Sequence, residues 1–461
     1  MRRVPEGASE LRHAIPLAIA AALVGVVSLL TTVFVAHVLS TRGYGTLIVL
    51  LGLFLVVSMP GTALLVGVVR RVSAWQASGL GGRVRPWVAR VHRIGEGSIV
   101  LLAIVMFLIR VPVAHALSLP GPSGVTEILT AGGVWILVSI DRGLLQVGRD
   151  YTDLSVNLVI EAVTRCALTV GLADELGVEG AALGLLFAEL ITATHARVTA
   201  TRAIVRGLAA AGPAESVPPT GEEVVAAVAV EETGGAVATS VHGGRALAAD
   251  VLTALGSLLL LAVLQNTDVI ILGSKMPHHS GAYAAISVPS KALVFVALVL
   301  VNYLLPEATL RHQSGSHALR QLAHTLGVMA IPCGVLLLMA LLAARGVLGL
   351  VFGHRLTAAA PAFSTLVLSM VFLSVTVALA IYLLGIGWRW VVVILAVGAG
   401  ALAGATAAAG GQYVATARAD LAVQVGLCAV MTVCFVTVHR RGVRRRAGAD
   451  GASPEAAQSL T

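Results

Sequence analysis

Two oppositely charged residues stand four positions apart inside an otherwise apolar stretch of this chain. Glu161 precedes Arg165, and this spacing places both side chains on one face of a helix. A guanidinium held there offers a planar pair of donors that suits a phosphate or diphosphate group. The same pattern is also typical of a self-neutralised structural ion pair, so both interpretations stay open.

A second group of polar residues lies more than a hundred positions further on. Lys291 is the only lysine within an apolar run, and it either meets a substrate phosphate or pairs with Asp268 of the preceding run. Asp268 lies nearer the end of its run, where water contact is the alternative role. Gln265 and Asn266 can hydrogen-bond either sugar hydroxyl groups or another helix.

Three further ionisable residues fall inside or near apolar runs. Glu189 lies between Ala188 and Leu190, and a carboxylate in such surroundings suits proton coupling. Pairing with a neighbouring helix is the other possibility for Glu189. Asp141 and Arg142 lie near the end of their run, where we expect them to reach the membrane surface by snorkelling.

The composition identifies what surrounds these groups. Apolar residues make up 57% of the 461 positions and charged residues only 12%. A soluble interior of this size could not bury so many apolar side chains, so the chain is predicted to be an all-α, polytopic membrane protein. The surplus of 31 Lys and Arg over 23 Asp and Glu indicates cytoplasmic loops rather than nucleic-acid binding.

About 20 apolar residues cross a bilayer as a helix, and with this length the chain divides into about twelve spans. Six precede a long polar gap and six follow it. The predicted spans are 14–39, 46–69, 98–117, 128–147, 154–173, 181–196, 251–272, 282–305, 323–342, 363–384, 391–409 and 421–438.

The distribution of basic residues predicts the orientation of these spans. Arginines gather in the first residues, between the second and third spans, and after the last span, which places both termini in the cytoplasm. They are Arg2, Arg3, Arg12, Arg70, Arg71, Arg83, Arg85, Arg90, Arg93, Arg440, Arg441, Arg444, Arg445 and Arg446. An Ala-, Val- and Arg-rich chain with two lysines is typical of bacteria, so we expect a bacterial cytoplasmic membrane.

The polar gap sets the predicted domain organisation. We expect an N-terminal six-helix bundle over 1–200, a cytoplasmic linker over 201–250, a C-terminal six-helix bundle over 251–438 and a cytoplasmic tail over 439–461. The sequence contains no GxxxxGK[ST] motif, so this polypeptide carries no P-loop ATP motor. The four cysteines show no CxxC spacing, and we expect no metal and no cofactor.

The two predicted bundles begin with similar hairpins. The first pair of spans meets at 40–45 (STRGYG) and the first pair of the second bundle at 274–283 (SKMPHHSGAY), each with glycine close to tyrosine. Transporters are often built from such repeated halves, with the substrate route between them.

These residues resemble a known family. The matching stretches are 35–45 (VAHVLSTRGYG), 268–273 (DVIILG) followed by Gly281-Ala282-Tyr283, Pro306, and 347–353 (VLGLVFG). They are similar to the polysaccharide-biosynthesis or Wzx-type oligosaccharide flippases of the MOP (MATE-like) exporter superfamily. The resemblance implies two six-helix bundles around a central cavity. Lipid II flippases of this superfamily carry arginine in their first span, whereas 14–39 contains none.

The resemblance implies a function without covalent chemistry. We expect a flippase, not an enzyme, that moves a polyprenyl-diphosphate-linked oligosaccharide for envelope polysaccharide biosynthesis. Arg165, Lys291, Glu161, Asp268, Gln265 and Asn266 would bind the substrate, and Glu189 or Asp268 would couple an ion. Membrane lipids and a glycan polymerase machinery are the expected partners, nucleic acid is not, and the chain is expected to be a monomer.

Two alternatives remain. A drug or cation antiporter of the same superfamily would favour a cavity dominated by carboxylates, whereas Arg165 and Lys291 favour an anion. A membrane glycosyltransferase or polymerase acting on lipid-linked sugars needs large outer loops to hold its acceptor, and the predicted outer loops are short.

Overall fold

A computed structural model describes residues 6–211, 242–311, 318–385 and 388–450, and within these ranges the chain is helical with no β-strand. The first part contains α1 (Glu6–Val38), α2 (Thr41–Ala77), η1 (Gly81–Arg83), α3 (Val84–Ala116), α4 (Val125–Val147) and α5 (Tyr151–Ala211). The second part contains α7 (His242–Lys275), α8 (Ser280–Arg311), α9 (Ala318–Leu342), α10 (Ala344–Phe352), η3 (His354–Ala359), α11 (Ala360–Gly385), α12 (Val391–Ala408) and α13 (Tyr413–Asp450).

The predicted polytopic membrane fold is confirmed. Each of the twelve predicted spans overlaps one of these helices, and the fifth and sixth spans are the two arms of α5. Within the described ranges, eight helices are long and apolar enough to cross a bilayer, with α5 counted once. The pair α9 and α10, bent by 98°, makes a ninth.

Helix α5 folds back on itself at Gly177, whose φ of 63° lies in the left-handed region. The returning arm then approaches the first arm very closely. A Cβ added at Gly180 would lie 1.8 Å from the carbonyl oxygen of Leu172, and one at Gly184 would lie 2.4 Å from that of Leu168. Glycines therefore allow the two backbones to touch and fix which residues of the arms face each other.

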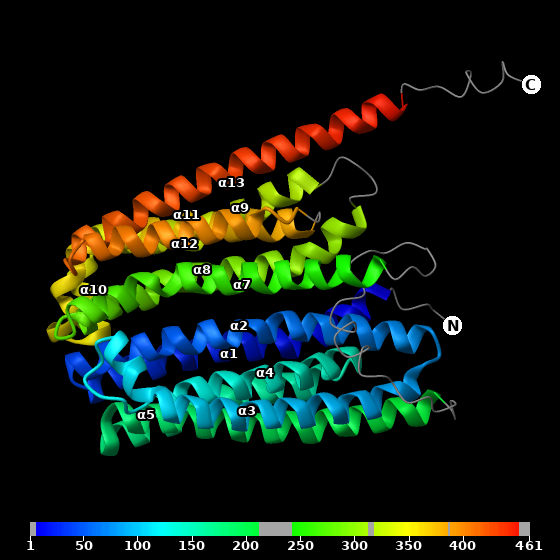
Figure 1. The fold of residues 1–461 in the computed structure, drawn as a ribbon, viewed down its shortest axis with the longest axis horizontal. Coiled ribbons are helices and arrows are strands. Elements are labelled where there is room, and N and C mark those ends of the chain that lie inside the picture. Colours follow the sequence, from blue (N-terminus) through cyan, green and yellow to red (C-terminus); the bar gives the residue numbers. More distant parts are fainter. Residues whose placement is uncertain (1–5, 212–241, 312–317, 386–387, 451–461) are drawn as a thin grey trace, which may run out of the picture.

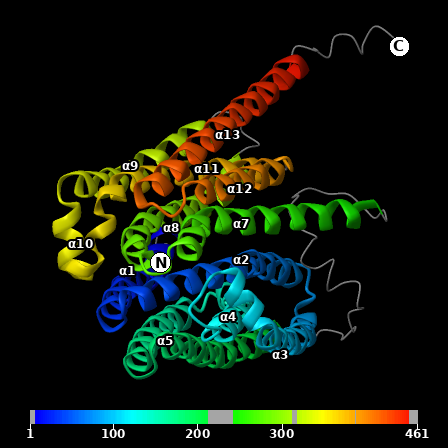
Figure 2. The same ribbon diagram turned by 60° about the vertical axis from the view of Figure 1, so that its left-hand side comes forward.

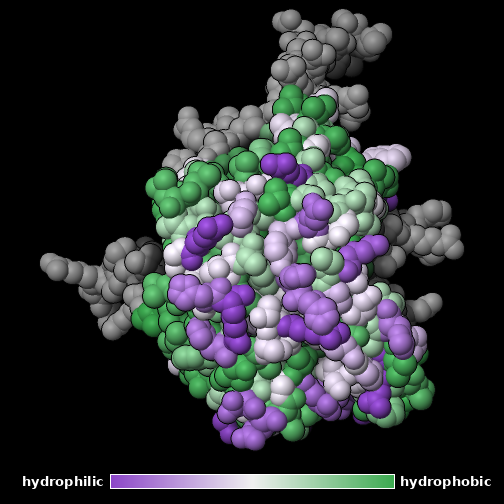
Figure 3. Space-filling model, turned by 90° about the vertical axis from the view of Figure 1, so that its left-hand side faces the viewer, coloured by the Kyte–Doolittle hydropathy of each residue, from purple (hydrophilic) through white to green (hydrophobic). Residues whose placement is uncertain are grey.

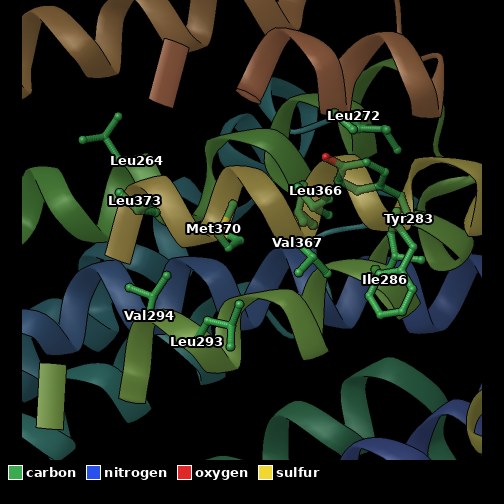
Figure 4. Packing of buried hydrophobic residues seen from close by; sticks show 14 of the residues in the cluster. Leu264, Leu272, Tyr283, Ile286, Leu293, Val294, Leu366, Val367, Met370 and Leu373 are labelled. Carbon is green, nitrogen blue, oxygen red and sulfur yellow. The ribbon is translucent and has the colours of Figure 1, made fainter. Parts of the chain in front are cut away.

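The helices form two groups that meet along α2. Helices α1 to α5 pack among themselves and α7 to α13 pack among themselves, while α2 lies against α7 and α8 (Figures 1 and 2). The second group has a core of α7, α8 and α11 side chains, several of which Figure 4 shows packed together. This arrangement agrees with the two expected bundles, while most of the predicted linker, residues 212–241, lies outside the described residues.

Apolar side chains also cover the outside of the molecule. Large apolar residues of α3 are exposed, among them Leu101, Ile104, Phe107 and Leu108. This helix runs unbroken through Pro112. Such a surface suits hydrocarbon contact. By contrast, the end that bears α10 gathers polar side chains, as Figure 3 shows.

Both ends of the described chain lie at the opposite end of the molecule from α10 (Figure 1). The turn from α2 to α3, with the exposed Arg85 and Arg93 nearby, lies at this same end. This placement agrees with an even number of spans. The cytoplasmic position of both termini stays a prediction.

The two similar hairpins of the sequence meet each other at the end that bears α10. Residues 41–45 were expected to form a turn, but they belong to α2, because the Ser40 hydroxyl caps the helix by accepting the Gly43 N–H at 3.1 Å. A Cβ at Gly45 would lie 1.9 Å from Ser280 Oγ, and one at Gly281 would lie 2.1 Å from the Thr41 carbonyl oxygen. Glycine is thus required where α2 and α8 begin.

The same end carries a second contact between the two groups. The Arg355 guanidinium of η3 donates hydrogen bonds to the carbonyl groups of Ala36 and His37, at the C-terminus of α1. These carbonyls have no partner within their own helix, and the positive charge also matches the negative end of the helix dipole. The rings of Tyr44 and Phe352 lie beside this contact, 6.4 Å apart.

We predict that Gly281→Ala destabilises the protein by about 1–3 kcal/mol, because the new methyl group would force α8 away from α2. Thermal unfolding in detergent measures this effect. Gly334→Ala in α9 is the matched control, since a Cβ there meets no atom within 4 Å and alanine favours helix. Equal unfolding temperatures for the two variants would contradict the close packing of α2 on α8.

Candidate functional site

Four charged residues form a paired cluster inside the first group of helices. Glu161 and Arg165 of α5 pair as their spacing predicts, and Arg165 also pairs with Glu189 from the returning arm. Glu161 in turn binds Arg142 of α4 at 2.5 Å. When all four are ionised, two arginines balance two glutamates. We call these residues the α5 cluster.

Arg142 corrects one expectation from the sequence. It does not snorkel to the surface but points into the bundle, with its side chain only 7% exposed. Its Nε donates to Asn157 Oδ1 at 2.8 Å, and Asn157 Nδ2 donates to the Thr192 carbonyl at 3.0 Å. These bonds hold Arg142 against both arms of α5, which gives it a structural role.

Asp141 is also buried, contrary to the expected snorkelling. Its carboxylate lies 2.9 Å from His92 Nε2 of α3, and the other ring nitrogen of His92 lies 3.0 Å from the Val88 carbonyl oxygen. This pair joins α3 to α4. The sequence offered no signal for it, because 49 residues separate the two partners.

Arg165 is the most accessible member of the α5 cluster. Its side chain is 28% exposed, whereas that of Glu189 is 0% exposed. Its guanidinium lies 5.7 Å from the centre of the Phe54 ring on α2. Arg165 is therefore both paired and open to a further partner, so neither of the two interpretations made from the sequence is excluded.

The second predicted group forms another cluster, between α7 and α8. Lys291 Nζ lies 3.3 Å from Asp268 Oδ1 and 3.5 Å from Asn266 Oδ1. The pairing with Asp268, which the sequence left open, is thus present, and Asp268 is buried rather than in contact with water. The Lys291 side chain is 9% exposed. Gln265 is also buried, and its Nε2 has no hydrogen-bond partner among the described residues.

Asp420 of α13 belongs to this region but was missed in the sequence. It is fully buried, accepts a hydrogen bond from Ser369 of α11 at 2.8 Å, and lies 3.4 Å from Gln424 Nε2. The predicted span began at residue 421, which placed Asp420 in a loop, whereas α13 begins at Tyr413. The spacing of Asp420 and Gln424, four residues apart, was the available signal.

Lys291, Asp268 and Asp420 make up what we call the α8 cluster. Tyr283 is fully buried and close enough to both aspartates to interact with them electrostatically. With one lysine and two aspartates, this cluster has a net charge of −1 when all three are ionised. The two clusters thus differ in charge: the first is balanced and the second has an excess of carboxylate.

Helix α2 separates the two clusters. Its Gly52 lies against Asn266, since a Cβ there would be 3.3 Å from Asn266 Oδ1, and its Phe54 lies against Arg165. These two positions are about 3 Å apart along the helix and roughly 9–12 Å from residue 46, where the predicted span begins. Both clusters therefore lie at a similar depth, well inside the predicted membrane.

Over the described ranges, no group of three or more His, Cys, Asp or Glu residues is arranged to hold a metal ion. The four cysteines, Cys166, Cys333, Cys428 and Cys434, are free thiols.

Comparison with known proteins identifies the fold but not a family. No protein-family model matches the chain, and no curated protein matches its sequence. Solved structures do match. An inward-facing multidrug resistance MATE transporter of the MOP superfamily has 12% identity over 93% of this chain and 99% of that chain, with a TM-score of 0.59.

Two further structures have the same fold. The lipid II flippase MurJ in an inward closed conformation has 10% identity over 91% of this chain and 87% of that chain, with a TM-score of 0.58. A MOP superfamily transporter from Pyrococcus furiosus has 13% identity over 94% and 95% of the two chains, with a TM-score of 0.53. The chain therefore has the fold of MOP superfamily transporters.

We predict that Ser369→Ala lowers stability by about 1–3 kcal/mol, because it leaves the buried Asp420 carboxylate without this donor. Thermal unfolding in detergent checks this. Ser374→Ala is the matched control, since Ser374 is equally buried on the same helix but bonds only to the Met370 carbonyl of its own turn. A loss of the same size in both variants would show that the bond to Asp420 contributes nothing.

Proposed function

We propose that this protein is a flippase that moves a polyprenyl-diphosphate-linked oligosaccharide across a bacterial cytoplasmic membrane. The observation that carries the proposal is Arg165, a partly exposed guanidinium well inside the predicted membrane, on a fold shared with transporters and a lipid flippase. Envelope polysaccharide biosynthesis is the process that such a flippase would serve.

The physical argument starts from the cost of charge in a membrane. A charged side chain at this depth costs at least about 2.5–3.5 kcal/mol, so it needs counter-ions or a wet cavity. The partly exposed Arg165 has Glu161 and Glu189 as its counter-ions, and a substrate anion would have to replace one of them. A diphosphate offers oxygens that match the two parallel donors of arginine.

The other predicted residues would complete the site from the far side of α2. Lys291 would offer a second cation, and Gln265 and Asn266 would bind sugar hydroxyl groups, with Asp268 orienting Lys291. These side chains are buried, and Asn266 is packed against Gly52. The two groups of helices must therefore move apart before substrate can reach both clusters, as alternating access requires.

An ion gradient would drive the return of the empty protein. Glu189 and Asp268 remain the proposed coupling residues, and Asp420 is added to them because it is equally buried near Asp268. Membrane lipids and a glycan polymerase machinery are the proposed partners. We propose a monomer with both termini in the cytoplasm, no cofactor, no nucleic-acid partner and no enzymatic activity.

One observation favours a second candidate, a drug or cation antiporter. The α8 cluster carries more carboxylate than ammonium, and the MATE transporter among the matching structures is named for multidrug resistance. Such a protein would take a cation at Asp268 and Asp420, and the α5 cluster would then be structural. By contrast, no arrangement in the described structure favours a glycosyltransferase or polymerase.

We expect Arg165→Ala and Lys291→Ala to slow flipping of a fluorescent polyprenyl-diphosphate saccharide in proteoliposomes by at least about tenfold each. This factor corresponds to the loss of one hydrogen bond to a charged group. Access of a membrane-impermeant quencher to the probe measures the rate. Arg165→Lys keeps the charge but not the paired donors, so its rate should fall between those of wild type and Arg165→Ala.

Arg93→Ala is the control for this assay, because it removes an exposed cation of α3 that belongs to neither cluster. If Arg165→Ala and Lys291→Ala both flip the probe at the rate of the wild-type protein, both cations are structural. If the wild-type protein moves no lipid-linked sugar, with or without an ion gradient, but exchanges an organic cation for protons, the antiporter replaces the flippase.

A further inference from the structure

Glu189 has an unusual position in the α5 cluster. Its side chain is fully buried, Oε1 accepts a hydrogen bond from Arg165, and Oε2 has no partner among the residues that the structure describes. Arg165 is therefore the group that balances its charge. An ionised carboxylate without that partner would be strongly unfavourable in such a site.

The other glutamate of the cluster does not depend on Arg165 in this way. Glu161 is also bound by Arg142, which Asn157 holds in place. If Arg165 turned toward a ligand, Glu161 would still have a cation, whereas Glu189 would have none. The movement of Arg165 thus leaves a single buried negative charge, on Glu189.

We propose that a proton taken up by Glu189 replaces Arg165 as its partner and so releases the guanidinium to bind an anionic lipid headgroup. The substrate class in this inference rests on the function proposed above. Proton and anion then bind together, so the affinity of the site for a lipid diphosphate increases as the pH falls.

The titratable groups near Glu189 come from several helices. On its own arm of α5, His195 Nδ1 lies 3.2 Å from Asn157 Nδ2, so this ring faces Asn157. From the first arm of α5, Glu189 faces Arg165 and Glu161, and from α4 it faces Arg142 behind Glu161. Helix α2 contributes the uncharged Phe54. Helix α1 also packs on α5, and between residues 16 and 38 its one titratable side chain is His37, which is bonded to the Val33 carbonyl of its own helix.

The proton step can be tested without any substrate. In Arg165→Gln the partner of Glu189 is gone, so infrared difference spectra at neutral pH should show the band of a protonated carboxyl group that wild type lacks. The band should disappear in the double variant Arg165→Gln with Glu189→Gln. If Arg165→Gln is folded and shows no such band, the inference is wrong, whatever the substrate is.

The release of Arg165 is tested by binding of farnesyl diphosphate to the protein in nanodiscs, between about pH 5 and pH 8. The phosphates of the probe titrate in this range, so the decisive quantity is the difference between wild type and Glu189→Gln. For each unit that the pH falls, the affinity of wild type should rise by up to about tenfold more than the affinity of Glu189→Gln. About tenfold per pH unit is the limit for one linked proton. Near pH 8, Glu189→Gln should bind farnesyl diphosphate more tightly than wild type does.

Glu175→Gln is the matched control, because it removes an exposed carboxylate from the same helix and should behave as wild type. Equal pH dependence of wild type and Glu189→Gln would overturn the inference. Wild type could bind no farnesyl diphosphate at any pH while Arg165→Gln still shows the carboxyl band. In that case the diphosphate assignment fails and the proton exchange at Glu189 stands.

Discussion

Pairing of charge in a medium of low polarity is the constraint that shapes the interior of this protein. The two arms of α5 must turn at Gly177 and touch through Gly180 and Gly184, because only then does Glu189 meet Arg165. Helix α4 must pack on the same face to bring Arg142 to Glu161. The ion pairs and the glycine contacts therefore specify one arrangement of these helices.

Helix α2 contacts both charged clusters. It contacts the α5 cluster through Phe54 and the region of the α8 cluster through Gly52, and its first turn meets the start of α8 at Gly281. A relative movement of the two helix groups would change the contacts at Gly52 and Gly281 together. The α5 cluster is balanced in charge, while the α8 cluster carries excess negative charge.

Much of this structure could be predicted from the sequence, because the apolar runs are as long as a bilayer is thick. The spacing of Glu161 and Arg165 was sufficient to predict their ion pair, since both lie on one helix face. Contacts between helices could not be predicted in the same way. Asp420 was missed because the predicted span began at residue 421, whereas α13 begins at Tyr413. Arg142 was assigned to the surface because its buried partner lies 19 residues further along the chain.

The proposed function requires the protein to recognise a negatively charged lipid headgroup. The most direct measurement compares binding of farnesyl diphosphate, uncharged farnesol and the organic cation tetraphenylphosphonium to the wild-type protein in nanodiscs. The account predicts that the diphosphate binds at least about tenfold more tightly than farnesol, as expected for one charge-assisted hydrogen bond, and more tightly than the cation. Preference for the cation, or equal binding of farnesol and its diphosphate, would contradict it.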